Sequence, residues 1–299
     1  MSLIKTISDL HTWLAEQGRN SKTLGLVPTM GYLHEGHLSL IRRAKAENDL
    51  VVISVFVNPT QFGPGEDFEK YPRDIERDYQ LASSAGADIV FNPEVGEIYV
   101  PGASTEVEVK GNIQKRLCGA SRPIHFKGVT TVVSILFHIV QPDRAYFGQK
   151  DAQQALIIRK MVRDLHMPVN VVVCPIVREK DGLAMSSRNI YLSPEERQQA
   201  LSLNRGLKKA QGYLASGTEG CRTVETLKRI VREEIEKEPL AQIEYVEIME
   251  AETLEDIEAI EPFRSALAAV AVRFGKTRLI DNTVLQWRED YNAAHAAEI

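Results

Sequence analysis

The sequence predicts an α/β protein: a Rossmann-like, doubly wound parallel sheet followed by a smaller C-terminal α+β domain. Two observations predict it. Up to residue 176, short apolar runs alternate with amphipathic helical patterns, as in successive strand–helix units. Beyond that point, two helical segments precede a group of strand-like runs, which is typical of an α+β domain. We therefore expect domains at 1–176 and 177–290, and a polar, alanine-rich tail at 291–299.

The strands of the first domain are predicted from its apolar runs. The run at 50–57 is nearly continuous and rich in β-branched residues, which suits a strand buried on both faces of a parallel sheet. The segment at 129–140 is apolar nearly all round, so its periodicity leaves helix and strand open. The other expected strands are 24–27, 88–91, 145–147 and 169–173, and the expected helices are 9–17, 74–85, 152–165 and one that begins near residue 35.

The second domain opens with a strong helix start. Ser193 can cap free backbone N–H groups, Pro194 fits the first turn, and the two glutamates that follow favour the positive end of the helix dipole. We expect one helix over 195–216 and another over 222–238, parted by two glycines. Strand-like runs follow at 243–249 and 266–274, with a shorter one at 277–280.

Composition excludes several classes of protein. The 299 residues are 43% hydrophobic and 26% charged, which is ordinary for a soluble globular chain, and the net charge of −5 argues against a nucleic-acid surface. No run approaches the roughly 18 apolar residues of a membrane span, and the first ten residues lack the apolar core of a signal peptide. Cys118, Cys174 and Cys221 match neither a zinc spacing nor a disulfide framework. We therefore expect a cytoplasmic protein with no nucleic-acid or membrane partner.

The stretch at 28–37 carries the strongest chemical pattern. It runs from an apolar strand through a glycine-bearing turn into a helix, an arrangement that presents a helix N-terminus to an anion. Gly31 and Gly36 allow close approach of a ligand to the backbone, and His34 and His37 can donate to phosphate oxygens. Two surface histidines at a helix start would be the alternative. The pairing of the histidines around a glycine favours a nucleotide-phosphate site.

The same stretch resembles a known family. His34-Glu35-Gly36-His37 is similar to the His-x-Gly-His signature of nucleotidylyltransferases and class I aminoacyl-tRNA synthetases. The longer string at 28–37 resembles pantothenate synthetases, the pantoate–β-alanine ligases, at every position except Tyr32, where that family varies. The resemblance is dense over 24–192 and extends less specifically to 278–282.

Three further stretches resemble the family's nucleotide site. Residues 148–151 follow an expected strand and open a helix, so that Lys150 can meet a phosphate, although a capping Asp151 and a solvated lysine would also explain them. Residues 185–188 resemble a shortened Lys-Met-Ser-Lys-Ser loop, and the backbone near Val177 can read adenine. The resemblance implies ATP contacts at Met30, Gly31, Tyr32, Leu33, His34, Glu35, Gly36, His37, Gly148, Gln149, Lys150, Asp151, Val177, Met185, Ser186, Ser187 and Arg188.

Neutral amides mark the expected acid site. Asn58 and Gln61 follow the second strand and can bind a carboxylate without damping its nucleophilicity as an arginine would. The turn-rich segment at 63–74 resembles a lid that excludes water, or is a mobile surface connection. We expect His125 to be structural, and Gln154 rather than Gln153 to reach pantoate. The contacts expected with pantoate or β-alanine are Pro28, Thr29, Met30, Asn58, Gln61, Arg122 and Gln154.

The sequence therefore predicts an ATP-dependent ligase that joins (R)-pantoate to β-alanine through a pantoyl adenylate, releasing AMP and pyrophosphate. The resemblance implies His37 as the proton donor, His34 and Lys150 as its catalytic partners, Mg²⁺ bridging the phosphates without a dedicated protein cage, and a homodimer. Two alternatives stay open. A simple nucleotidylyltransferase would need basic residues for a phosphorylated substrate, and a non-catalytic ATP-binding or tRNA-associated module would not need intact phosphate motifs.

Overall fold

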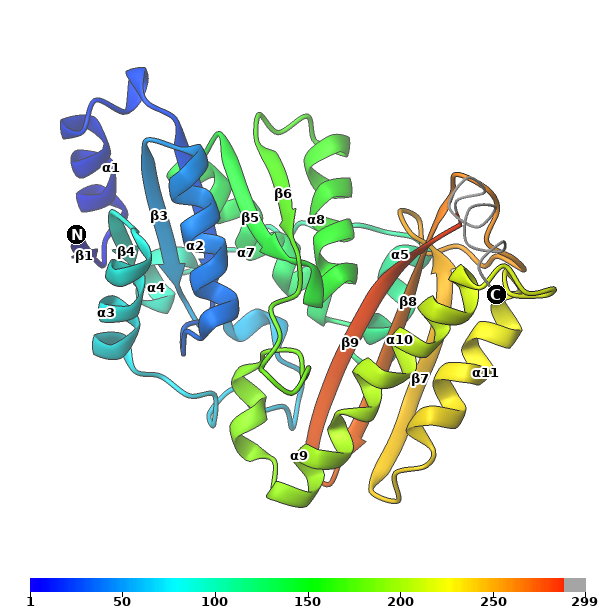
Figure 1. The fold of residues 1–299 in the computed structure, drawn as a ribbon. Helices are drawn as coiled ribbons and strands as arrows, with labels where there is room; N and C mark the ends of the chain where they lie inside the picture. The colour runs from blue at the N-terminus through cyan, green and yellow to red at the C-terminus, as the bar shows by residue number, and fades with distance from the viewer. Residues whose placement is uncertain (288–299) are drawn as a thin grey trace. The chain divides into compact units, whose positions relative to one another are not determined.

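The computed structural model describes residues 1–287 and divides the chain into two compact units (Figure 1). The first unit comprises Met1–Lys115 and Gly119–Val177. The second comprises Arg116–Cys118 and the chain from Arg178 onward. The expected tail at 291–299 lies outside the described residues. No helix within residues 1–287 is long and apolar enough to cross a membrane.

The first unit is built on a six-stranded parallel sheet, which confirms the predicted doubly wound fold. The strand order is β1-β4-β3-β2-β5-β6. Strands β2 and β3 are almost wholly buried, as expected for a sheet covered on both faces. The strands are β1 Ser2–Ile4, β2 Leu24–Thr29, β3 Leu50–Val55, β4 Ile89–Phe91, β5 Arg144–Gly148 and β6 Asn170–Cys174.

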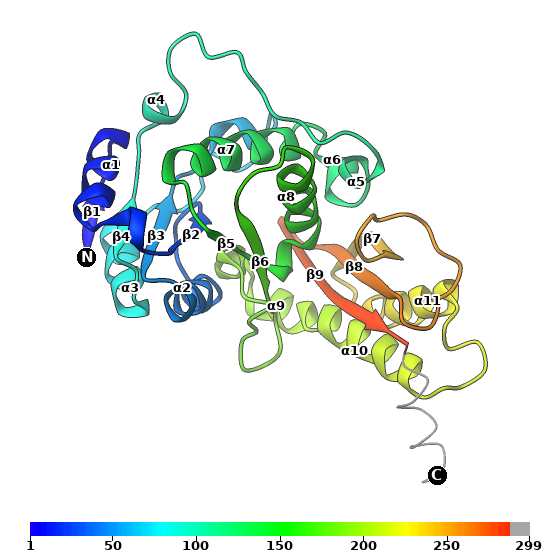
Figure 2. The same ribbon diagram turned by 90° about the horizontal axis from the view of Figure 1, so that it is seen from above.

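Helices cover both faces of this sheet. In Figure 2, α2 and α3 lie on one side of the strands and α1 and α7 on the other, with α8 packed beside α7. The segment that periodicity left open is the helix α7, and nearly all of its side chains are buried. The longer helices are α1 Ile7–Glu16, α2 Glu35–Glu47, α3 Ile75–Ala85, α7 His125–Val140 and α8 Ala152–Asp164; the short ones are α4 Val95–Ile98, α5 Asn112–Lys115, α6 Cys118–Ser121 and the 3₁₀ turns η1 Arg19–Ser21, η2 Pro59–Gln61 and η3 Gln149–Asp151.

The order of the strands sets the place of the site. From β2 the chain moves outward to β3 and β4, then returns to the opposite side of β2 with β5 and β6. This reversal makes the boundary between β2 and β5 a topological switch point, where ligands of such sheets bind beyond the carboxyl ends of the strands. The residues that follow Thr29 and Gly148 therefore lie next to one another at the same edge of the sheet.

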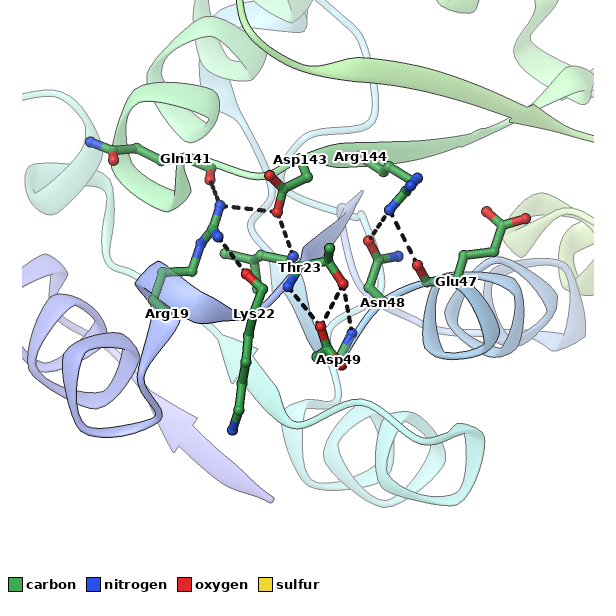
Figure 3. A network of polar contacts seen from close by, with 10 residues as sticks. Arg19, Lys22, Thr23, Glu47, Asn48, Asp49, Gln141, Asp143 and Arg144 are labelled. Carbon is green, nitrogen blue, oxygen red and sulfur yellow. Dashed lines mark hydrogen bonds and ion pairs between the residues drawn. The ribbon is translucent and has the colours of Figure 1, made fainter.

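A polar network ties the amino ends of three strands together, at the edge opposite the switch point (Figure 3). The Asp49 carboxylate accepts from both the backbone N–H and the hydroxyl of Thr23, each over 2.8 Å. The Asp143 carboxylate accepts from the Leu24 N–H over 2.7 Å and pairs with Arg19 over 3.1 Å. Because these carboxylates precede β3 and β5, they anchor the start of β2 between its two neighbours.

The second unit carries an antiparallel sheet of order β7-β8-β9, with α10 and α11 against it. The predicted helix start is confirmed: Ser193 and Glu196 form a reciprocal capping box. The expected single helix over 195–216 is wrong, since two helices meet at Leu201. The elements are the 3₁₀ turn η4 Ser187–Tyr191, α9 Pro194–Ala200, α10 Ser202–Ala215, α11 Val224–Ile235, β7 Ala241–Glu250, β8 Ser265–Phe274 and β9 Thr277–Gln286.

The last strand is also longer than predicted. Strand β9 continues past residue 280 to Gln286 and pairs with β8 along its whole length. The prediction stopped early because Asp281 and Asn282 interrupt the apolar run, yet both side chains are buried. Because of this polar pair, the prediction missed the last six of the ten residues of β9.

Candidate active site

The turn between β2 and α2 has two consecutive residues with positive φ. Gly31 has φ of 83° and Tyr32 has φ of 51°, both in the left-handed region. A Cβ on Gly31 would lie 2.8 Å from Val55 Cγ1 and 2.9 Å from the Asp78 carboxylate. Glycine is thus required at residue 31 by both its dihedral angle and its surroundings.

Asp78, which the sequence analysis missed, fixes this turn. Its carboxylate is buried and accepts from the backbone N–H groups of Tyr32 and Leu33, each over 2.7 Å. Burial raises the pKa of Asp78, and the two hydrogen bonds oppose that rise. The two N–H groups are consequently occupied by Asp78, so in this conformation they shape the turn and are not available to a ligand.

A signal for Asp78 exists in the sequence. The buried residues of α3 are Asp78, Ala82 and Ala85, spaced as one helical face. A carboxylate in the stripe that packs on the sheet needs hydrogen-bond donors there. The prediction of a helix over 74–85 did not single out this residue.

The two signature histidines lie against one another at the start of α2. Their rings stack with centroids 4.0 Å apart, and the His34 backbone N–H donates to His37 Nδ1 over 3.3 Å. Because Nδ1 accepts a hydrogen bond, the proton of a neutral His37 ring lies on Nε2. Burial lowers the pKa of His37 well below 6.5, and the charges of His34 and Lys150 lower it further. His37 is therefore a neutral Nε2–H donor at neutral pH.

Lys150 comes to the same place from the other side of the switch point. It lies in η3, directly after β5, and its half-buried ammonium is 3.5 Å from the Asp151 carboxylate. Its charge acts on the His37 ring. The structure thus brings together the histidine pair and the lysine, which the sequence predicted from stretches more than 100 residues apart.

Gln61 lies in η2, just after β3, and is held in a fixed orientation. Its side chain is 7% exposed, its Oε1 accepts from Asn58 Nδ2 over 3.1 Å, and its backbone carbonyl contacts His125 Nδ1 at 3.0 Å. Its Nε2 faces the Met30 sulfur at 3.1 Å. Sulfur is a weak acceptor, so this amide retains N–H groups for an oxygen ligand.

Asn58 donates a hydrogen bond to Gln61, and all of its amide hydrogens are engaged. It is 1% exposed, and its Nδ2 donates both to Gln61 Oε1 and to the Gly128 carbonyl, 3.1 Å each. Its Oδ1 accepts from the Tyr99 hydroxyl over 2.7 Å. Asn58 was predicted to touch the substrate. In this structure it has no amide hydrogen left for one, and it positions Gln61.

The two neighbouring glutamines, of which Gln154 is the predicted pantoate contact, differ in their surroundings. Gln153 is 5% exposed and donates to the carbonyl of Ile113 over 2.9 Å, which ties α8 to α5. Gln154 is half-buried, and no hydrogen bond engages its side chain within residues 1–287. Gln154 is the one with capacity to bind an acid.

Two other predicted ligands are engaged elsewhere. Arg122 forms a two-pronged ion pair with Glu66 of the 63–74 segment, with the Nε–Oε1 distance at 2.8 Å. Glu35 pairs on the surface with Arg42. In this conformation Arg122 holds the expected lid segment, and Glu35 contributes only its place in the backbone.

The remaining substrate candidates border the turn. Thr29 accepts from the Gly31 N–H over 3.2 Å and donates to the Ser54 carbonyl over 2.8 Å, so it stabilises the turn. Pro28 and Met30 are half-buried at the end of β2. Gly148 and Gln149 are half-buried at the end of β5.

The second unit carries the other predicted phosphate loop. Met185, Ser186, Ser187 and Arg188 are all half-buried. Ser186 is the N-cap of η4 and accepts from the Arg188 N–H over 3.3 Å. The Ser186 hydroxyl thereby stabilises the first turn of η4, which contains Arg188.

Metal ligands are sparse in the described part of the chain. Residues 1–287 contain no group of three or more His, Cys, Asp or Glu side chains placed to hold an ion.

Comparison with known proteins gives a consistent result. The chain matches the model of the pantoate-beta-alanine ligase family over residues 2–284. It is 55% identical over 285 residues to a pantothenate synthetase of Thermotoga petrophila, with 95% of this chain and 100% of the relative covered. It is 53% identical over 286 residues to one of Acetivibrio thermocellus, with 96% and 100% covered.

Solved structures agree with the sequence relatives. A pantothenate synthetase from Thermus thermophilus superimposes with a TM-score of 0.88 at 47% identity, over 95% of this chain and 99% of that one. A pantoate-beta-alanine ligase from Francisella tularensis, complexed with beta-gamma ATP and beta-alanine, gives a TM-score of 0.74 at 34% identity, over 95% and 97%. The chain belongs to the pantoate-beta-alanine ligase family.

Proposed function

We propose that this enzyme, a ligase by family, condenses (R)-pantoate with β-alanine in two steps through a pantoyl adenylate, with ATP as the source of AMP and pyrophosphate. One observation carries the proposal: a neutral histidine donor and a lysine come together at the switch point, and Gln61, which follows the neighbouring strand β3, keeps amide hydrogens for an acid. That combination suits attack of a free carboxylate on a phosphorus atom.

Pantoate binding follows from the two glutamines. Gln61 Nε2 and the Gln154 side chain donate to the oxygens of pantoate without bringing a positive charge to them. The carboxylate keeps its nucleophilicity, because no ion pair stabilises its lone pairs. Asn58 and His125 act through Gln61, since they hold its side chain and its carbonyl.

The first step is attack of the pantoate carboxylate on the α-phosphorus of ATP, which forms the mixed anhydride and releases pyrophosphate. His37 Nε2–H and Lys150 stabilise the negative charge that builds on the phosphate oxygens. Ser186, Ser187 and Arg188 are assigned to the β- and γ-phosphates, and Val177 to adenine. Magnesium bound to the phosphates would neutralise further charge.

The second step is attack of the β-alanine amine on the acyl carbon, with AMP as the leaving group. A mixed anhydride hydrolyses if water reaches it, so a lid at 63–74 has a direct purpose. The Glu66–Arg122 ion pair supports that assignment, because it fastens the segment to the residues before α7.

A product assay tests the function. With ATP, Mg²⁺, pantoate and β-alanine, we expect AMP and pantothenate in equal amounts and no ADP. Formation of ADP would contradict the proposal. Turnover with a phosphorylated acceptor instead of pantoate would favour a simple nucleotidylyltransferase. The homodimer and the cytoplasmic location stay predictions, which sedimentation and cell fractionation test.

A further inference from the structure

A short hairpin precedes the predicted phosphate loop of the second unit. Arg178 and Ala184 form an antiparallel bridge at its base, and the Glu179 N–H donates to the Leu183 carbonyl over 2.8 Å. The turn is closed by the Gly182 N–H, which donates to the Glu179 carbonyl over 2.9 Å. We call residues 178–184 the hairpin. It ends immediately before Met185.

A bidentate ion pair joins the hairpin to strand β9. Two nitrogens of Arg178 donate to the two carboxylate oxygens of Asp281, over 2.6 and 2.9 Å. One of these nitrogens also donates to the Gly182 carbonyl over 3.1 Å, so the same guanidinium spans the hairpin. Paired, planar contacts of this kind fix orientation as well as distance.

Asp281 occupies a position where a carboxylate is not expected. Alternate residues of a strand share a face, and Leu279 and Leu285 on that face belong to the apolar core under the helices. The Asp281 side chain is 2% exposed. A buried ion pair is often no more stable than apolar residues of the same size, so its presence indicates a role in geometry.

We propose that Asp281 and Arg178 are positioning residues for the ATP-binding loop at 185–188. The ion pair with Asp281 orients Arg178, and Arg178 stabilises the base of the hairpin. Because the loop at 185–188 follows the hairpin directly, the position of the hairpin sets the position of the loop. Val177, the predicted adenine contact, directly precedes Arg178 in the chain. The inference rests on the proposed function, and it gives a purpose to the 278–282 stretch.

Other contacts fix a different part of the hairpin. Arg197 of α9 pairs with Glu179 and Asp181 in the turn, over 2.7 and 2.6 Å. Asn189 donates to the Glu179 carboxylate over 2.8 Å. These contacts hold the tip. Loss of the Asp281 charge would therefore loosen the base while the tip stays attached, which shifts the loop without unfolding it.

The experiment compares Asp281→Asn with Glu234→Gln. Glu234 is the control, because it is a buried carboxylate of the same unit, 6% exposed, and its partners Arg205, Lys209 and Lys237 lie outside the hairpin. Both variants remove one buried charge with little change of shape. We expect both to melt at lower temperature. Only Asp281→Asn should lower kcat/KM for ATP, by about 10²-fold through KM.

The KM for pantoate should stay within about twofold in both variants, since neither residue is assigned to the acid. Arg178→Lys keeps the charge and loses the fork, so it should shift the KM for ATP in the same direction by less. It also serves as the test if Asp281→Asn does not fold. Equal effects of Asp281→Asn and Glu234→Gln on ATP, or an unchanged KM for ATP, would overturn the proposal.

Titration with a non-hydrolysable ATP analogue separates this inference from the proposed function. Weaker analogue binding in Asp281→Asn than in Glu234→Gln supports the positioning role whatever the acid substrate is. Failure of the wild-type protein to ligate pantoate would instead remove the proposed function. The two failures are thus distinguishable.

Discussion

The protonation state and tautomer of His37 follow from its immediate contacts. The His34 backbone N–H donates a hydrogen bond to Nδ1 of His37, and burial lowers the pKa of the ring so that it stays neutral. The ring proton therefore lies on Nε2, which can donate to a ligand. A neutral donor stabilises charge as it develops on phosphate without first forming a tight ion pair with the ground state.

His37→Ala should therefore lower the adenylation rate by about 10²–10³, the scale of losing one preorganised donor. The circular dichroism spectrum should stay unchanged, because the His37 ring stacks on His34 and alanine is a good helix former at the start of α2. Single-turnover formation of the adenylate measures the effect. Near-normal turnover would remove His37 from the mechanism.

Lys150 and Lys180 provide a second comparison between single residues. Lys150 is half-buried beside the histidines, whereas Lys180 is exposed at the turn of the hairpin. Lys150→Ala should reduce kcat/KM for ATP much more than Lys180→Ala, because only Lys150 faces the expected phosphates. The rank order decides, and equal effects would contradict the phosphate assignment.

At the scale of elements, the β2–α2 turn depends on a carboxylate from α3. Asp78→Asn keeps the shape but points an amide at one of the two N–H groups that the carboxylate now accepts. The turn should open, and kcat should fall together with stability. Asp143→Asn is the control: its carboxylate also accepts a backbone N–H, but at the amino ends of the strands, where it is 44% exposed.

Urea unfolding and steady-state kinetics of both variants check this prediction. Asp143→Asn should lower stability and leave kcat within about twofold. The account of the turn would be wrong if the two substitutions affected kcat alike.

Some of the helices and strands could be predicted from the sequence and others could not. Runs such as 50–57 predicted strands because burial on both faces leaves a continuous apolar signal. β1 was missed because it is three residues long and only Ile4 is buried. The helix α7 stayed ambiguous, since a helix buried all round carries no periodicity.

The site divides in the same way. The turns that carry His34, His37 and Lys150 could be predicted, because each is a local strand–turn–helix pattern in the sequence; the roles of the three residues stay proposals. Asp78 and the partners of Asn58 and Arg122 come from distant segments, and only the fold brings them together. Whether a side chain can bind a ligand depends on which of its hydrogen-bond donors are already engaged. Those partners are set by the tertiary structure and cannot be predicted from the local sequence.

At the scale of the molecule, buried histidine makes stability depend on pH. Burial lowers the pKa of His125 from 6.5 to about 4, with Arg122 adding to the shift. Between those values the unfolded chain binds the proton that the folded chain refuses. Stability therefore falls as pH falls through this window, by about 2 kcal/mol at pH 5 for this group. His37 acts in the same direction.

Urea denaturation at pH 7 and pH 5 measures this dependence. His125→Asn should lose less stability than the wild-type protein between the two pH values, because its shifted group is gone. Parallel profiles would show that His125 does not carry the effect.

The stepwise reaction is the central claim, and pyrophosphate exchange tests it most directly. With ATP, Mg²⁺ and pantoate but no β-alanine, the enzyme should exchange labelled pyrophosphate into ATP, because the adenylate forms before the amine is needed. Omitting pantoate should abolish the exchange, and Gln154→Ala should reduce it by about 10²-fold while ATP binding stays near normal. Exchange that strictly requires β-alanine would contradict the account.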